Sequence, residues 1–393
     1  MYLIIFGLAQ NLLYLGLTII FSPILYLGIF LRRISHSKDG RLKILIIQIA
    51  KIGDVVCTTP VFREIKKNFP SSLLSVLIIS RAKGILIKNT HIDELIILDD
   101  KRYQGFLGGL RLIRDARKKQ FDWSFSLAPT LFNTIFPFWA LASHRVLLRS
   151  KYVSRAAYLA SILSKHHIDY EQNKLVLRQY LQMLKFLGVK EYSEKRDVFF
   201  DGNDIAKAQD FLRENNIKEN DLIMGISPTA GNKIKEWGLL KFSALADILI
   251  QNMGARIIFF GGPSDKPFIK KVLSNMKNSA SDASEVFGLS EVPALIKFLK
   301  IFISVDTGPL YIANALGVPI VDIIGPMNVE EQLDIDEKCE IVSKNVYCFP
   351  CSHIVPTAHG CKEGHRKCVQ DITVEDVYKA VVRLKERVYL LVT

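Results

Sequence analysis

The stretch IFISVDTGPLYIANALGVPIVDIIGPMN, residues 301–328, determines the predicted fold. The apolar run at 301–305 is typical of a buried strand, and a helical run follows from Leu310 to Leu316. A second apolar run at 318–324 completes a parallel strand–helix–strand unit. Such units bind ligands beyond the carboxyl ends of their strands, and the free amides at the start of the helix favour a phosphate there.

The turn Asp306-Thr307-Gly308-Pro309 connects the first of these strands to the helix. Pro309 suits the first turn of a helix. Two interpretations of the residues before it remain open. Asp306 or Thr307 only caps the helix, because both residue types are common caps, or the turn holds a ligand.

The composition limits the classes of protein to which the chain belongs. A length of 393 residues is enough for two or three domains. The net charge of +13 favours an anionic partner, such as an anionic lipid, a phosphorylated glycan or a nucleotide. The sequence has neither an aromatic-and-basic RNA-binding pattern nor a zinc-finger helix, so nucleic acid is not an expected partner.

The N-terminal segment predicts attachment to a membrane. Residues 1–31 contain no charged side chain, and about 20 apolar residues are enough to span a bilayer. We therefore predict a membrane anchor with a basic flank over residues 1–40. The segment lacks the basic start and the small-residue cleavage site of a signal peptide. Its length and Pro23 leave two geometries open, a single transmembrane helix and a kinked or re-entrant segment.

Four basic residues at the end of this segment orient it in the membrane, and they are Arg32, Arg33, Lys38 and Arg41. By the positive-inside rule they hold the following domains on the cytoplasmic side of the membrane.

Residues 41–200 predict a first α/β domain, because strand and helix patterns alternate along them. The first strand, at 42–50, leads into the turn Lys51-Ile52-Gly53-Asp54. A carboxylate at the start of a helix is kept ionised by the helix dipole and suits a general base, although Asp54 also fits a simple cap. Gly53 permits a close approach of backbone or ligand. The fingerprint G-x-G-x-x-G is absent from this turn, which argues against a nicotinamide dehydrogenase.

The region 101–155 is rich in basic side chains: Lys101, Arg102, Arg111, Arg114, Arg117, Lys118, Lys119, Arg145, Arg149, Lys151 and Arg155. Most of them fit solvated helix faces. The alternative is a surface that faces anionic headgroups or a phosphorylated acceptor, where each basic group contributes about 1 kcal/mol.

Residues 201–345 predict a second α/β domain of the same kind. Three of its turns are expected along one edge of the sheet, at 228–237, 261–265 and 306–309. Their small residues admit the phosphates of a ligand, and Lys235 neutralises them as a point charge. The carboxylate of Asp265 can accept hydrogen bonds from the hydroxyl groups of a sugar. Together these turns favour a nucleotide ligand.

Four segments resemble glycosyltransferase family 9, the lipopolysaccharide heptosyltransferases, and they are KILIIQIAKIGDVVCTTPVFREIKKNFP (43–70), ISPTAGNKIKEWGLLKFSALADIL (226–249), IIFFGGPSDK (257–266) and VDTGPLYIANALGVPIVDIIGPMN (305–328). The resemblance extends in order over about residues 42–385. It implies an α/β fold of the GT-B class, with two Rossmann-like domains facing a central cleft. Residues 41–200 then form the acceptor domain and residues 201–345 the nucleotide-sugar domain.

The resemblance also implies roles for single residues. The family's proposed catalytic base falls on Asp54, and its contact to the donor diphosphate falls on Lys235. The other expected donor-binding residues are Thr229, Asp265, Asp306, Thr307, Gly308 and Tyr311, with Gly53, Gly261 and Gly262 as positions of close approach. Many family members have His at the position of Tyr311, and tyrosine is not cationic at neutral pH.

The implied reaction is an inverting, metal-independent transfer of a sugar, with ADP-heptose as the favoured donor. The expected acceptor is an anionic lipid-linked glycan, such as the lipopolysaccharide core. Two alternatives remain open: the same fold with another nucleotide-sugar donor, and a catalytically idle membrane-bound protein that binds a glycan or nucleotide. No cofactor is expected for catalysis.

Residues 346–393 combine a cysteine-rich loop with a closing helix. The spacing of four cysteines suggests a small structural zinc site, and they are Cys348, Cys351, Cys361 and Cys368. Reduced thiols and zinc fit a cytoplasmic domain better than disulfides do, but the irregular spacing leaves zinc, disulfides and free thiols open.

Overall fold

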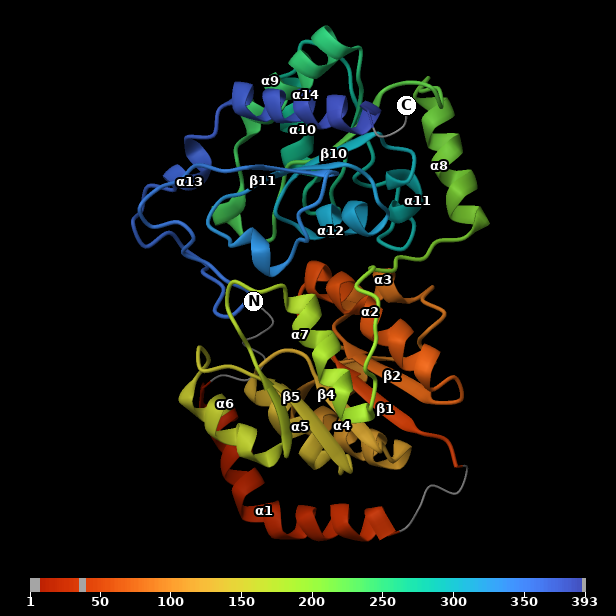
Figure 1. Cartoon of the computed structure of the whole chain (residues 1–393), viewed down its shortest axis with the longest axis vertical. Helices are drawn as coiled ribbons and strands as arrows, with labels where there is room; N and C mark the ends of the chain where they lie inside the picture. Colours follow the sequence, from red (N-terminus) through yellow and green to blue (C-terminus); the bar gives the residue numbers. More distant parts are fainter. Residues whose placement is uncertain (1–7, 35–39, 391–393) are drawn as a thin grey trace. The chain divides into compact units, whose positions relative to one another are not determined.

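The computed structural model describes residues 8–34 and 40–390, which form two units, each built around its own sheet (Figure 1). The first unit contains the described residues up to Ala50 together with Thr58–Lys83 and Thr90–Glu194. The second contains Lys51–Cys57, Gly84–Asn89 and the described residues from Lys195 onward. The turn that carries Asp54 is therefore grouped with the second unit.

The first unit has a six-stranded parallel sheet in the order β3-β2-β1-β4-β5-β6. Its strands are β1 (Lys43–Ile47), β2 (Leu73–Ile78), β3 (Glu94–Ile97), β4 (Trp123–Ser126), β5 (His144–Arg149) and β6 (His166–Asp169). The helices along this part of the chain are α1 (Leu8–Ile34), α2 (Ile52–Asn68), α3 (Lys83–Leu86), α4 (Gly105–Lys119), α5 (Leu131–Trp139), α6 (Arg155–Ala160) and α7 (Val176–Gln182). The strands β1 and β2 are buried along almost their whole length, which explains their largely apolar sequences.

The second unit repeats this topology, with the order β12-β11-β10-β7-β8-β9. Its strands are β7 (Ile223–Ser227), β8 (Arg256–Phe259), β9 (Ser281–Asp282), β10 (Ile301–Val305), β11 (Ile320–Ile323) and β12 (Cys339–Val342). Its helices are α8 (Gly202–Glu214), α9 (Leu239–Met253), α10 (Lys266–Ser274), α11 (Val292–Ile296), α12 (Gly308–Ala315), α13 (Lys367–Gln370) and α14 (Val374–Leu390). Its core packs β7, β8, β10 and β11 against α9 and α14.

Each sheet has one switch point, where the chain reverses its direction across the sheet. In the second unit this point lies between β7 and β10, which pair in parallel with Ser227 opposite Ser304. Ligands of doubly wound sheets bind outside the carboxyl ends of the strands at such a point. The two turns that follow β7 and β10 begin at Pro228 and Asp306, so two of the three expected donor-binding turns start here.

Helix α1 is long and apolar enough to cross a membrane, with mean hydropathy 2.0 over Leu13–Ile34. It is a single helix with Pro23 inside it, and it bends along its length in Figure 1. One face packs on the first unit, where Leu25 and Ile29 contact Phe138 of α5. Residues 1–7 and 35–39 of the predicted anchor, including Lys38, lie outside the described residues.

Candidate active site

Asp306 directly follows β10 and is almost completely buried. One carboxylate oxygen, Oδ2, accepts a hydrogen bond from the Nζ of Lys235 at 2.5 Å. The other, Oδ1, lies 2.5 Å from the hydroxyl of Tyr311, which donates to it. Lys235 is itself buried, in the turn that follows β7. Three residues that are far apart in the sequence therefore meet at the switch point of the second sheet.

The start of α12 distinguishes between the two interpretations of the turn at 306–309. Thr307 is the N-cap residue, and its side chain makes no capping hydrogen bond. The carboxylate of Asp306 contacts Lys235 and Tyr311 instead. The interpretation of this turn as a simple side-chain cap is therefore wrong.

Burial and neighbouring groups act on the protonation of this cluster in opposite directions. Burial alone would raise the pKa of Asp306, but the charge and hydrogen bond of Lys235 and the hydroxyl of Tyr311 lower it below its ordinary value. Burial, followed by the charges of Asp306 and Asp322, raises the pKa of Tyr311 well above its ordinary value. Tyr311 is therefore a neutral hydrogen-bond donor beside an ionised carboxylate.

Asp54 lies in the first turn of α2 and has two kinds of partner. Its Oδ2 accepts the backbone N–H of Lys51 at 3.1 Å, so the residue does help to cap its helix. Its Oδ1 accepts a hydrogen bond from Nε2 of Gln332 at 3.0 Å. The Oε1 of the same Gln332 lies 2.7 Å from the Tyr311 hydroxyl. Gln332 therefore links Asp54 to the Asp306 cluster.

Gln332 was not identified from the sequence. It follows the short helix η7 (Val329–Glu331), in a loop without a recognisable motif. Arg196 fixes the position of this residue by donating to its backbone carbonyl at 2.7 Å. Its role in the cluster depends on the path of this loop, which the pattern of residues does not reveal.

Two glycines permit the close packing of the Asp54 turn against α12. A Cβ atom on Gly53 would lie 2.7 Å from the ring of Tyr311, and one on Gly308 would lie 2.9 Å from the side chain of Ile52. Both distances are too short for real contacts. The expected close approach at Gly53 is therefore made by the ring of Tyr311.

The pKa of Asp54 is raised above its ordinary value, chiefly by burial. The charges of Lys51 and Lys235 and the Lys51 backbone hydrogen bond act against this, and Asp306 adds to it. The helix dipole, from which an ionised Asp54 was predicted, acts in the opposite direction to burial. A carboxylate with a raised pKa is a stronger base, which suits proton abstraction near neutral pH.

The remaining predicted donor-binding residues lie in neighbouring turns. Asp265 precedes α10, and its Oδ2 accepts the backbone N–H of Gly262 at 2.9 Å. A Cβ on Gly261 would lie 2.9 Å from the Cβ of Asp265, so this glycine is needed for the turn to close. Thr229 is buried in the turn after β7. The contacts described for Asp265 thus belong to its own turn and not to the Asp306 cluster.

Asp322 is a second buried carboxyl group, and it was not predicted from the sequence. It lies on β11 opposite Ser304, and neither of its oxygens has a hydrogen-bond partner among the described residues. Burial, followed by the charge of Asp306, raises its pKa well above the ordinary value, although Lys235 lowers it. The apolar run at 318–324 concealed this residue, because one polar side chain does not interrupt a strand pattern.

An Asp322→Asn variant is expected to gain stability relative to the wild type as the pH rises. The folded pKa of Asp322 is raised, so the native state holds a proton that the unfolded state releases above its ordinary pKa of 3.8. Wild-type stability therefore falls as the pH rises from there towards the folded pKa. The amide does not titrate, so the difference in Tm between variant and wild type should be more positive at pH 8 than at pH 5. Exposed Asp334→Asn is the control, and an equal difference at both pH values would contradict the argument.

The cysteine-rich loop is described in full, and all six cysteines of the chain are free thiols. The structure therefore contains no disulfide bond between the four cysteines of this loop, which was one of the three alternatives. Backbone N–H groups, first that of Arg366, lower the pKa of Cys361, whereas burial raises the pKa of Cys368 to about 11. Within residues 8–34 and 40–390, no three His, Cys, Asp or Glu side chains are grouped as a metal site requires. Zinc at this loop remains an untested prediction.

Comparison with known proteins finds the same family that the sequence motifs resemble. The model of "Glycosyltransferase family 9 (heptosyltransferase)" matches residues 109–361. Among curated proteins, the chain is 25% identical over 279 residues to lipopolysaccharide heptosyltransferase 3 of Escherichia coli. That match covers 70% of this chain and 80% of the relative.

Solved structures share the fold. The chain is similar to a glycosyl transferase family 9 protein from Veillonella parvula, with a TM-score of 0.74 and 23% identity, over 88% of this chain and 98% of the other. It is also similar to E. coli ADP-heptose lps heptosyltransferase II, with a TM-score of 0.67 and 17% identity, over 88% and 99% of the two chains. The two parallel sheets are thus those of a GT-B-like α/β fold.

Proposed function

Because this chain belongs to glycosyltransferase family 9, the heptosyltransferase family, we propose that it transfers a heptose from ADP-heptose to a cell-envelope glycan. The similar E. coli structure is named for ADP-heptose, which supports the donor. The curated relative is a lipopolysaccharide heptosyltransferase, which supports the lipopolysaccharide core or a related glycan as the acceptor. The resemblance also implies that the two domains face each other across a cleft, and this arrangement remains a prediction.

The hydrogen-bonded group around Asp306 supports the proposal independently of the family match. A general-base candidate, Asp54, is joined through Gln332 and Tyr311 to the buried ion pair of Asp306 and Lys235. The group lies at the switch point of a nucleotide-binding type of sheet. A base and a phosphate-binding cation close to one another are what a sugar transfer from a nucleoside diphosphate requires.

In the proposed reaction, a hydroxyl oxygen of the acceptor attacks C1 of the donor sugar. A bond forms between that oxygen and C1 as the bond from C1 to the diphosphate oxygen breaks. Attack opposite the leaving group inverts the configuration at C1. Asp54 accepts the hydroxyl proton as general base, and its raised pKa strengthens it for this step.

The nucleoside diphosphate leaves with the electron pair of the broken bond, and its negative charge needs stabilisation. Lys235 provides a cation in the turn that follows β7, and the N–H groups of Thr307 and Gly308 lie at the start of α12. Asp306 holds the ammonium group of Lys235 in place before the donor binds. Lysine carries three N–H donors, so it can bind a phosphate oxygen while it keeps Asp306.

The N-terminal helix supports a location at the cytoplasmic face of the inner membrane. Its apolar length satisfies the hydropathy criterion, and Arg32 and Arg33 lie at its carboxyl end. A membrane-attached enzyme would meet a lipid-linked acceptor at the surface where that acceptor is anchored.

One observation favours the alternative that the donor is a nucleotide sugar other than ADP-heptose. Tyr311 stands where many family members have His, and its neutral hydroxyl donates to Asp306. A neutral donor at this position supplies less charge stabilisation to a diphosphate than a cationic side chain would. The identity of the nucleotide is therefore the first property to test.

ADP is expected to stabilise the full-length chain in neutral detergent, whereas UDP, GDP and CMP are not. A ligand at about 100 times its Kd adds roughly 2.7 kcal/mol to the free energy of unfolding, which raises Tm by a few degrees. The measurement is a thermal shift with the four nucleotides at equal concentration. The full chain is used because α1 packs on α5.

The other outcomes distinguish a different nucleotide-sugar donor from a catalytically idle binding protein. Stabilisation by UDP or GDP instead of ADP would keep the fold and the reaction type but replace the donor. The absence of a shift with any of the four, followed by no transfer from any donor tested, would support an idle binding protein.

A further inference from the structure

A cavity of about 330 Å³ lies at the carboxyl end of α1, in the first unit. It is bounded by the residues that directly precede β1, β4 and β5, so it lies at the amino ends of these strands. Ligands of such sheets are expected at the opposite, carboxyl, edge. None of the residues of the candidate active site lines this cavity.

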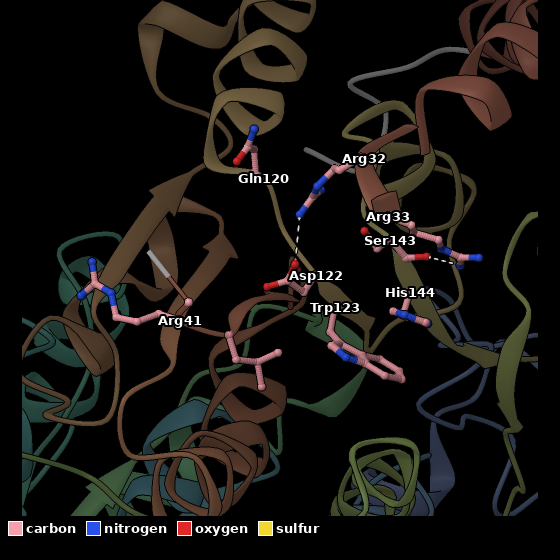
Figure 2. A pocket seen from close by; sticks show the side chains of 10 residues that line it. Arg32, Arg33, Arg41, Gln120, Asp122, Trp123, Ser143 and His144 are labelled. Atoms are coloured by element: carbon pink, nitrogen blue, oxygen red, sulfur yellow. Dashed lines mark hydrogen bonds and ion pairs between the residues drawn. The ribbon is translucent and has the colours of Figure 1, made fainter. Parts of the chain in front are cut away.

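Basic side chains predominate around the cavity. Among the described residues that line it, Arg32, Arg33 and Arg41 are the arginines and Asp122 is the one carboxylate. Figure 2 shows Arg32 reaching towards Asp122, whereas the side chain of Arg41, on the other side, points away from that carboxylate. The distance from the Arg32 guanidinium to Asp122 Oδ1 is 3.5 Å, and Asp122 Oδ2 also accepts the backbone N–H of Lys43. Asp122 therefore pairs with one of the three arginines that line the cavity, and the net charge of these side chains is positive.

The protein holds two of these guanidinium groups in fixed positions. Arg32 donates to the carbonyl of Leu141 at 2.7 Å, and Arg33 donates to the carbonyl of Ser143 at 2.5 Å (Figure 2). Each guanidinium has five N–H donors, so these contacts leave donors for an anion. A planar, oriented guanidinium is the side chain best suited to bind phosphate oxygens.

Trp123 and His144 form an aromatic wall beside the basic groups, with their rings stacked at 4.4 Å between centroids. The pKa of His144 is lowered, first by burial and then by the nearby charges of Arg33, His166 and Arg145. This direction is consistent with a positive potential around the cavity. Such a potential favours an anionic ligand.

The surface next to the cavity is apolar. The side of α1 that does not pack on α5 exposes Ile20, Ile24, Leu27, Phe30, Leu31 and Ile34, each by more than half of its surface. Basic groups at the end of an exposed apolar helix meet the phosphate layer when that helix enters a bilayer. The expected anion therefore has a lipid tail that follows α1.

We propose that this cavity binds the phosphate of an anionic phospholipid, attracted by the positive charges of Arg32, Arg33 and Arg41, with the exposed face of α1 beside the acyl chains. The chemistry recognised is a phosphate group, which free phosphate shares. The apolar face of α1 makes the lipid the expected source. The site does not depend on the function proposed for the second unit.

The test uses the full-length chain in neutral detergent at constant ionic strength. Short-chain phosphatidylglycerol, short-chain phosphatidylcholine and inorganic phosphate are titrated, and the rise in Tm gives each apparent affinity. The variant Arg33→Gln/Arg41→Gln removes two exposed charges and keeps Arg32, whose contacts anchor α1. Arg114→Gln, an exposed arginine on α4 outside the cavity, is the matched control.

The wild type and the control are expected to bind phosphatidylglycerol saturably and more tightly than phosphatidylcholine. The double variant should bind phosphatidylglycerol about 25-fold more weakly, because each charge contributes about 1 kcal/mol, or roughly fivefold. Equal losses in the control and the double variant, or no loss in either, would overturn the site. Inorganic phosphate that binds as tightly as the lipid would overturn the lipid as the ligand.

Discussion

An Asp54→Asn variant is expected to fold and to bind nucleotide like the wild type but to lose about 10²–10⁴-fold in kcat, the usual contribution of a general base. The amide keeps an oxygen to accept the backbone N–H of Lys51, which preserves the start of α2. The amide of Gln332 can flip to accept from the new side chain, because its other partner, the Tyr311 hydroxyl, can donate or accept. Only the capacity to accept a proton is removed.

The dependence of activity on pH provides a second readout. The pKa of Asp54 is raised by burial, and the protonated form cannot act as a base. Wild-type kcat/KM should therefore fall as the pH drops through that pKa, and Asp54→Asn should lack this limb. Asp210→Asn, an exposed change on α8, is the control. If Asp54→Asn kept more than about a tenth of wild-type turnover, the assignment of the base would be wrong.

Much of the fold was predictable because both sheets are parallel and buried. Apolar runs and the turns after them indicate such strands without any knowledge of their order, and β10, α12 and β11 fall where the opening stretch predicts them. Helix α5 was not predicted, because its sequence LFNTIFPFW is aromatic and contains Pro137. That helix forms because it packs between the sheet and α1, and such a tertiary contact has no local signal.

The predictable part of the candidate site is the part that lies in turns directly after strands. Lys235 and Asp306 fall in this class, Tyr311 lies in the first turn of the helix that follows, and the structure brings the three together. Gln332 and Asp322 could not be found in the same way, since one lies in an irregular loop and the other inside an apolar strand. Arg145, which the sequence grouped with basic surface residues, is buried and donates to the carbonyls of Leu163 and Ala142.

A Lys235→Met variant is expected to lose activity and stability together, and the two losses have different causes. Loss of the cation removes stabilisation of the leaving diphosphate, which should lower kcat/KM by about 10²–10³-fold. It also leaves Asp306 as a buried carboxylate without its ion-pair partner, which costs about 3–5 kcal/mol of unfolding free energy. Lys233→Met is the matched control, since Lys233 is two residues away and forms an exposed pair with Glu236. That change should have little effect on either property.

The double variant Lys235→Met/Asp306→Asn separates the two causes. It removes both charges of the pair, so no unpaired carboxylate is left at Asp306 and much of the lost stability should return. Activity should not return, because the diphosphate still lacks its cation. Chemical denaturation and steady-state kinetics on the single and double variants measure the two properties side by side. If activity recovered with stability, Lys235 would act only as the structural partner of Asp306, and the charge of the leaving group would have to be stabilised elsewhere.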